Sequence, residues 1–213
     1  MINIKHFVCN SLQENCYVVS DDSGDAVVID CGALYDAERR AITAYIDQQH
    51  LHVCHVLCTH AHFDHCFGLA TLWHHCGVKP SLPLLDEPFA DIDSQMLLML
   101  GTHYNDEQAP VGTYYRDGDI FRFGNHQLTA IATPGHSPGS CCLYCADEKV
   151  LFTGDTLFRM SIGRTDLNGG NWTDMQHSLA TLAAMPADTK VLPGHGPATT
   201  IADELMYNPY LNS

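Results

Sequence analysis

The sequence predicts an α/β protein that folds as a single domain, residues 1–213, with two βαβ-like halves. Its length fits one domain. Short runs rich in Val and Ile alternate with longer runs in which apolar residues recur at helical spacing. In both halves a strand-like run ends in a turn that carries histidine or aspartate, and no linker or low-complexity segment separates the halves. We therefore expect strands and helices to alternate within one domain.

The first half begins with β-like runs separated by polar turns. These runs cover residues 2–7, 16–19 and 26–29, which predicts an antiparallel opening. Helical spacing of apolar residues then predicts one helix over residues 35–49. Residues 53–58 are rich in β-branched side chains and predict a buried strand. Asp30 ends the third run and is either a supporting hydrogen-bond partner for the segment after residue 58 or an ordinary turn aspartate.

That segment, Thr59–His65, holds four potential metal ligands: His60, His62, Asp64 and His65. His60 and His62 are two residues apart, whereas a helical pair of ligands is spaced by four, so the segment belongs to a loop before a helix over residues 66–75. Loop histidines are usually only polar surface groups, but nitrogen and oxygen donors packed this closely suit zinc or iron. Structural zinc sites favour cysteine, so these donors indicate a catalytic site.

The second half repeats the arrangement of a strand followed by a turn with one ligand type. We expect a short strand over 80–85, a helix over 88–100 ended by Gly101, a loop over 101–118, strands over 125–131, 141–145, 149–152 and 190–192, and a helix over 174–184. His136 lies in a turn rich in Pro and Gly after one strand, and Asp155 and His195 follow later strands. These three residues are further candidate ligands.

Composition narrows the choice of partner and compartment. The chain has 10 basic and 25 acidic side chains, a formal charge of −15, which argues against a nucleic-acid partner. No apolar run reaches the roughly 18 residues of a membrane span, and the N-terminus lacks the apolar core of a signal peptide, so we expect a cytoplasmic protein without membrane association. The 10 cysteines indicate reduced, mostly buried thiols. Cys142 and Cys145 match CxxC within a strand-like run, which disfavours a redox role.

Four motifs together resemble the ordered metal motifs of the metallo-β-lactamase fold superfamily. They are THAHFDH at 59–65, TPGHSPGS at 133–140, FTGDTLF at 152–158 and LPGHGP at 192–197. Within that superfamily the chain is most similar to short bacterial members of the hydroxyacylglutathione hydrolase (glyoxalase II) group, through residues 154–158 and 161–166. The resemblance implies a four-layer αββα sandwich of two mixed β-sheets, with the metal site at one edge of the sheets.

The resemblance also implies a ligand set and a reaction. His60, His62 and His136 would hold one divalent ion, and Asp64, His65 and His195 the other, with Asp155 bridging both. The ions would be zinc, or else iron or manganese. A hydroxide bridging them would attack the carbonyl of a small thioester. Asp64 and Asp155 are therefore the expected catalytic residues.

Two arginines are candidate anchors for a substrate carboxylate, because arginine forks fit that group. They are Arg164 and Arg159, although Arg164 could instead pair with Asp166 and stabilise its loop. Full-length glyoxalase II carries a helical domain after the last histidine. Only residues 196–213 follow His195 here, so we expect no such domain.

Other members of the superfamily fit less well. True β-lactamases of this fold do not use the bridging aspartate, the flavodiiron branch has glutamate where His62 stands, and the tRNA-processing branch acts on nucleic acid. The nearest competitor is a persulfide dioxygenase with one iron, held by two histidines and one aspartate. A lactone or ester hydrolase is a further alternative, and a metal-binding protein without catalysis would leave open coordination positions unexplained. The sequence does not fix the acyl group, the thiol carrier, the native metal or the oligomeric state.

Overall fold

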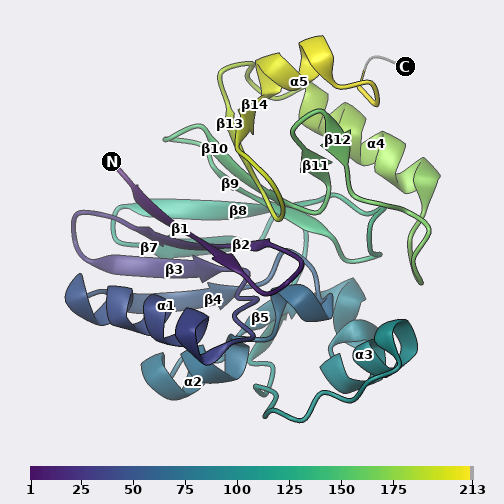
Figure 1. The fold of residues 1–213 in the computed structure, drawn as a ribbon. Helices are drawn as coiled ribbons and strands as arrows, with labels where there is room; N and C mark the ends of the chain where they lie inside the picture. Colours follow the sequence, from purple (N-terminus) through teal and green to yellow (C-terminus); the bar gives the residue numbers. More distant parts are fainter. Residues whose placement is uncertain (212–213) are drawn as a thin grey trace.

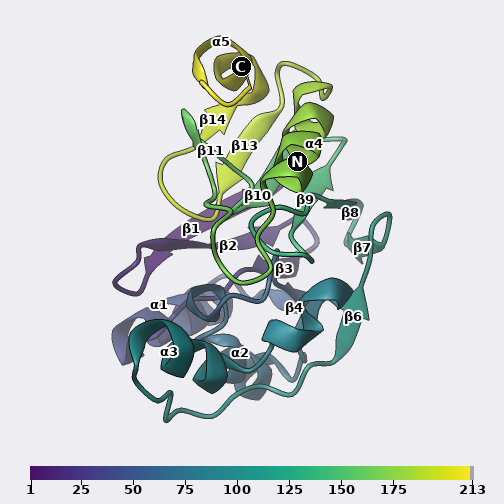
Figure 2. The same ribbon diagram turned by 90° about the vertical axis from the view of Figure 1, so that its right-hand side faces the viewer.

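Two mixed β-sheets pack face to face, with helices on both outer sides (Figure 1). A view turned by 90° shows the same layers, with α1, α2 and α3 below the sheets and α4 and α5 above them (Figure 2). The structure is a computed structural model that describes residues 1–211. This four-layer arrangement confirms the expected αββα sandwich.

The first sheet has the strand order β1-β2-β3-β4-β5-β6. Its strands are β1 (Asn3–Cys9), β2 (Glu14–Ser20), β3 (Asp25–Ile29), β4 (His52–Leu57), β5 (Ser81–Pro83) and β6 (Thr113–Tyr115). The pairs β1-β2 and β2-β3 are antiparallel, which confirms the predicted opening, and the pairs from β3 to β6 are parallel. Its helices are α1 (Asp36–Gln48), α2 (Leu69–Cys76), α3 (Ile92–Leu100) and the short 3-10 helices η1 (Phe63–His65) and η2 (Leu84–Phe89).

The second sheet has the strand order β14-β13-β10-β9-β8-β7. Its strands are β7 (Ile120–Phe123), β8 (His126–Ala132), β9 (Cys141–Cys145), β10 (Val150–Gly154), β13 (Lys190–Pro193) and β14 (Thr199–Thr200). Only β10 and β13 pair in parallel. A small hairpin of β11 (Leu157–Phe158) and β12 (Ser161–Ile162) follows β10, and helices α4 (Trp172–Ala183) and α5 (Ile201–Tyr207) lie outside the sheet (Figure 1).

In strand β3 apolar residues follow one another without alternating polar residues, and the packing on its two faces explains this pattern. Val27 and Ile29 pack between the sheets, together with Phe152 of β10, while Val28 packs on the other side with Ile42 of α1. Both faces of β3 are therefore covered, as is usual for strands with parallel neighbours. Burial of each such side chain contributes about 1.5–3 kcal/mol, so this core holds the sheet edge rigidly where the candidate ligands lie.

The structure corrects several predicted boundaries. The helix expected over 88–100 begins only at Ile92, because residues up to Phe89 form η2 and the Asp91 side chain caps α3 by accepting a hydrogen bond from the Asp93 N–H. Gly101 ends α3 in the left-handed conformation, as expected. The loop expected over 101–118 contains β6, whose buried Tyr115 hydroxyl donates to the Cys58 carbonyl at 2.7 Å. The helix expected over 66–75 begins at Leu69, because η1 and a turn come first.

Candidate metal centre

The ligand loop starts where β4 ends, and Asp30 holds it in place. The Asp30 carboxylate accepts hydrogen bonds from the Thr59 N–H at 2.6 Å and from the Thr59 hydroxyl at 2.8 Å. Asp30 itself has a φ of 48°, a left-handed conformation that few non-glycine residues adopt. The structure thus favours the interpretation of Asp30 as a hydrogen-bond partner that holds the ligand loop, and not as an ordinary turn aspartate.

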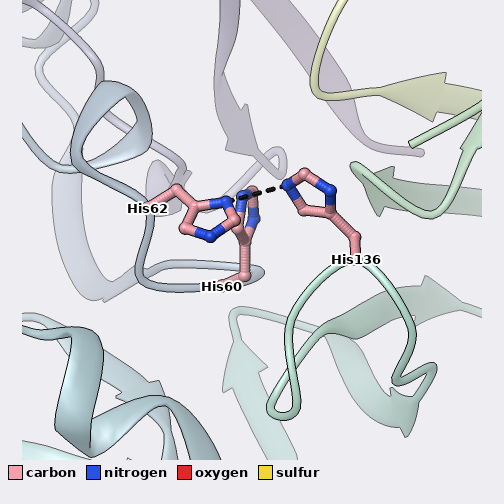
Figure 3. Close-up of side chains that lie close together, drawn as sticks. All are labelled: His60, His62 and His136. Carbon is pink, nitrogen blue, oxygen red and sulfur yellow. Dashed lines mark hydrogen bonds between the residues drawn. The ribbon is translucent and has the colours of Figure 1, made fainter. Parts of the chain in front are cut away.

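His60, His62 and His136 form a first group of rings that converge from two loops (Figure 3). His62 Nδ1 lies 2.8 Å from His136 Nε2. The other ring nitrogen of His136 is 2.8 Å from the Arg164 carbonyl oxygen. A carbonyl only accepts, so His136 Nδ1 carries the proton and its Nε2 presents a lone pair to His62. His60 Nε2 is buried without a hydrogen-bond partner.

Asp64, His65 and His195 form a second group. His195 Nδ1 lies 3.0 Å from the Leu12 carbonyl oxygen, which fixes a proton there, and its Nε2 lies 3.3 Å from Asp64 Oδ2, a carboxylate that favours a second proton on the ring until a cation replaces it. His65 is fully buried, and its Nε2 lies 3.8 Å from the same carboxylate oxygen. On its other side, His65 Nδ1 lies 3.1 Å from Asp30 Oδ2, close enough for an ion pair but not aligned for a hydrogen bond.

Asp155 lies between the two groups. Its Oδ1 is 3.4 Å from His65 Nε2, and its Oδ2 is 3.6 Å from the Nε2 atoms of both His136 and His195. The carboxylate is therefore adjacent to a histidine of the first group and to two histidines of the second. The structure brings all seven candidate ligands together, and their role as ligands stays a prediction.

The two groups differ in electrostatics. Burial and the neighbouring histidines lower the pKa of His60 well below its ordinary value, and burial with His136 lowers the pKa of His62 to about 4. Burial also opposes charge on His65 and His195, but nearby carboxylates, chiefly Asp64 and Asp155, outweigh it and raise the pKa of both rings. His60 and His62 thus offer neutral imidazoles, whereas a cation entering the second group has to displace protons.

The residues present fit divalent metal ions. His60 Nε2, His65 Nε2 and Asp155 Oδ1 are buried and have no hydrogen-bond partner, an arrangement that costs about 1–3 kcal/mol for each atom unless something binds there. Within each group the donor atoms lie within 4.8 Å of one another. Imidazole and carboxylate donors without a thiol suit zinc, iron or manganese.

Two residues that the sequence analysis missed hold the loops. The buried Asp86 carboxylate accepts hydrogen bonds from the Ala61 N–H at 3.0 Å, the Ser137 hydroxyl at 2.7 Å and the Gly139 N–H at 2.6 Å. Burial raises the pKa of Asp86. Gln95 of α3 donates to the Ala61 carbonyl at 2.8 Å and accepts from the Phe63 N–H at 3.2 Å. No motif marks either residue, because these contacts join distant parts of the chain.

The two candidate arginines lie outside the group of seven. The Arg164 side chain is exposed and forms two hydrogen bonds with Asp166, at 2.6 and 2.7 Å, while its carbonyl oxygen holds His136. Arg159 is exposed in the β11-β12 hairpin, where it lines a cavity of about 260 Å³ with Thr199 and Tyr207. The pairing with Asp166 considered for Arg164 is thus present, and substrate binding by either arginine stays a prediction.

An αββα sandwich with histidines and aspartates gathered at one edge defines a class of metal-dependent proteins. A family model described as the metallo-beta-lactamase superfamily matches residues 10–195, and the chain belongs to that superfamily. Its members are mostly metal-dependent hydrolases and bind divalent metals, often two. None of the helices formed by residues 1–211 is long and apolar enough to cross a membrane.

Known proteins resemble this chain over nearly its full length. The hydroxyacylglutathione hydrolase GloC of Haemophilus influenzae is 31% identical and matches 100% of this chain and 99% of its own. The crystal structure of the BLEG-1 B3 metallo-beta-lactamase has a TM-score of 0.90 and 30% identity, covering 99% of this chain and 100% of that one. TTHA1623 in a di-iron-bound form has a TM-score of 0.84 and 34% identity, covering 97% and 100%.

Proposed function

We propose that this protein is a metal-dependent hydrolase that cleaves a small thioester, with two divalent ions in the metal centre. The observation that carries the proposal is the position of Asp155, whose carboxylate lies within 3.6 Å of histidines from both groups. A carboxylate so placed can serve two ions at once. The likeness to GloC supports a thioester of a glutathione-like thiol as the substrate class.

In this proposal the two groups divide the ligands. His60, His62 and His136 would hold one ion, Asp64, His65 and His195 the other, and Asp155 would contact both. When bound, such a pair of ions lowers the pKa of water and polarises a carbonyl group, which is the chemistry that thioester hydrolysis requires. Zinc suits these donors, and the di-iron form of TTHA1623 supports iron as an alternative.

The chain's own contribution is to fix the ligands before the substrate arrives. The Arg164 and Leu12 carbonyls hold the Nδ1 protons of His136 and His195, so that both Nε2 atoms face inward, where a bound ion would take their lone pairs. Asp30 and Asp86 hold the two loops that carry the first group. Ligands held this rigidly need little rearrangement during the reaction.

The substrate is proposed to be a small molecule. The formal charge of −15 disfavours a phosphate backbone, and no nucleic acid or membrane partner is proposed. Arg164 lies next to the turn that holds His136 and is the better of the two candidate anchors for a carboxylate, because its carbonyl already touches the metal centre. To bind a substrate carboxylate, the Arg164 guanidinium has either to release Asp166 or to contact both carboxylates at once.

The deciding experiment compares three reactions on the same preparations loaded with zinc or with iron. The assays measure cleavage of S-lactoylglutathione, oxygen uptake with glutathione persulfide, and hydrolysis of a chromogenic β-lactam. The β-lactam is included because BLEG-1 is a metallo-beta-lactamase of nearly the same fold. We expect thioester cleavage to be the fastest of the three reactions, together with about two ions per chain.

Two results would overturn the proposal. Oxygen uptake without thioester cleavage, in protein that holds one iron, would identify a dioxygenase. β-Lactam hydrolysis that exceeds thioester cleavage would place the protein with the β-lactamases. A variant with Asp155→Asn serves as the control in each assay, since activity that survives this change comes from a contaminant or from a different centre.

A further inference from the structure

Three further side chains of metal-ligand type lie at the other end of β4 from the metal centre. They are Asp25 on β3 and His52 and Cys54 on β4. His52 is the first residue of β4, whereas the ligand loop follows Leu57 at the end of that strand. The strand rises about 3.3 Å per residue, so its two ends are about 16 Å apart. This group therefore shares no residue with the metal centre.

The three donor atoms are close enough to share one ion. Asp25 Oδ1 lies 2.9 Å and Cys54 Sγ 3.6 Å from His52 Nδ1, and all three atoms lie within 4.8 Å of one another. In a tetrahedral zinc site, bonds of about 2.0 Å to nitrogen or oxygen and 2.3 Å to sulfur separate the donors by about 3.3–3.5 Å. The two distances to His52 Nδ1 thus differ from these values by a few tenths of an ångström, and the carboxylate and thiol, which lie within 4.8 Å of each other, would have to approach by at most about 1.3 Å.

The backbone builds this group from two paired strands. The register of β3 and β4 shifts between Ala26 opposite Val53 and Val27 opposite His55, which leaves Cys54 as an extra residue in a β-bulge. Bulges re-aim side chains. The Asp25 side chain is also held in one orientation, because its second carboxylate oxygen accepts a hydrogen bond from the Gly124 N–H at 3.1 Å. Donors on paired strands are held more rigidly than donors on a loop.

Hydrogen bonding alone accounts for part of this arrangement. His52 pairs with Asp25, and the Cys54 thiol lies 3.6 Å from the His52 carbonyl oxygen as well as from the ring. Two observations are not explained by hydrogen bonding alone and favour an ion. The thiol points at the same ring nitrogen as the carboxylate, although one nitrogen can serve only one of them well. The His52 side chain is also 79% exposed, so an ion from solvent can reach the group.

We propose that Asp25, His52 and Cys54 bind a third divalent ion, of the zinc class. The ion would replace the thiol proton of Cys54 and take the lone pair of His52 Nδ1, whose proton moves to Nε2, with water completing the shell. A thiolate ligand selects borderline or soft ions such as Zn²⁺ and Co²⁺ over Mg²⁺ and Ca²⁺. The site does not depend on the proposed thioesterase function.

Cobalt distinguishes this site from the metal centre. The seven residues of the metal centre include no cysteine, so a thiolate-to-cobalt charge-transfer band in the near ultraviolet reports a different site. The full chain, with all cysteines reduced, is titrated with Co²⁺ beyond two equivalents. We expect the band to appear with the third equivalent, and zinc analysis after desalting to give one ion fewer for Cys54→Ser than for the unchanged protein.

Matched variants decide the outcome. Cys76 is the other partly buried thiol, so Cys76→Ser is the control and should keep the band. Cys54→Ser should lose it completely, and His52→Ala should weaken cobalt binding at least tenfold. Absence of the band in the unchanged protein at saturating cobalt, or an undiminished band in Cys54→Ser, would overturn the proposal.

Discussion

At the scale of single residues, Asp155 joins the two halves of the metal centre. The Asp155 carboxylate lies within 3.6 Å of one histidine of the first group and two of the second. In the absence of ions, burial disfavours its charge, but His65, His136 and His195 keep its pKa below the ordinary value. A carboxylate that stays ionised in this position can neutralise two cations.

We predict that Asp155→Ala loses most of its bound metal and that its thioesterase activity falls by more than about a hundredfold, because the carboxylate that lies between the two cations is removed. Metal analysis and turnover measurements test this, and far-UV circular dichroism reports whether the fold persists. Asp166→Ala is the control, since Asp166 is exposed and contacts Arg164 outside the metal centre. Two bound ions and near-normal turnover in the Asp155 variant would rule out the bridging role.

Arg164 can contribute through its side chain as well as through its carbonyl. We predict that Arg164→Ala lowers kcat/KM about tenfold for thioesters with a free carboxylate and leaves neutral thioesters nearly unchanged, because a charge-assisted hydrogen bond is lost. The measurement is the ratio of kcat/KM for the two kinds of thioester. Arg159→Ala serves as the matched variant. An equal loss for both substrates would indicate that Arg164 only supports the loop around His136.

At the scale of secondary-structure elements, Asp86 joins the ligand loop, the His136 turn and η2. It accepts hydrogen bonds on both sides of the first histidine group. We predict that Asp86→Ala destabilises the metal-free protein by roughly 2–4 kcal/mol, because buried donors lose their acceptor. We also expect about 10- to 100-fold weaker binding of the first zinc ion.

Urea unfolding and zinc competition measure these two effects separately. Asp86→Asn should lie between the unchanged protein and Asp86→Ala, because the amide keeps one acceptor oxygen and turns a donor toward the other partners. Glu87→Ala is the control, since Glu87 is exposed next to Asp86 and should leave both quantities unchanged. Zinc affinity in Asp86→Ala equal to that of the control would show that the loops hold their ligands without Asp86.

Local sequence patterns predicted the elements that carry candidate ligands and missed the contacts that support them. The strand before His60 and the turn around His136 were predicted from β-branched runs and from Pro and Gly, which act over a few residues. Asp86 was missed because its three partners are 25, 51 and 53 residues away. Strand β6 was missed because its three residues have no periodicity, and only its pairing with β5 makes it a strand.

At the scale of the whole molecule, Asp21 links the two sheets. From the turn between β2 and β3 it accepts hydrogen bonds from Ser23 and from the Asn125 N–H in the turn between β7 and β8. These hydrogen bonds, led by that of the Ser23 hydroxyl, lower the pKa of Asp21 from 3.8 to about 2. Folding therefore favours the ionised form, and the stability that Asp21 contributes is present above about pH 4 and is lost as pH falls toward about 2.

We predict that the difference in unfolding free energy between the unchanged protein and Asp21→Asn is constant from about pH 7 to pH 5 and shrinks below about pH 4. Urea unfolding of the metal-free protein at several pH values gives this difference. Asp22→Asn controls for the loss of one surface charge, since Asp22 is exposed in the same turn. A difference that stays the same down to about pH 2.5 would contradict the assigned cause.

The cores also determine what happens when metal is removed. Among residues 1–211, three clusters of buried apolar side chains fill the space between the sheets and beneath the helices, and none of them includes any of the seven candidate ligands of the metal centre. Each ion in thousandfold excess over its dissociation constant adds about 4 kcal/mol to the stability of such a protein, so the two proposed ions add about 8 kcal/mol. For a chain of this length, 1 kcal/mol corresponds to roughly 2–4 °C in Tm. We therefore predict that chelation abolishes thioesterase activity and lowers Tm by roughly 15–30 °C, while thermal unfolding stays cooperative. Calorimetry before chelation, after it and after addition of zinc tests this, and loss of the cooperative transition would show that the ions are required for folding itself.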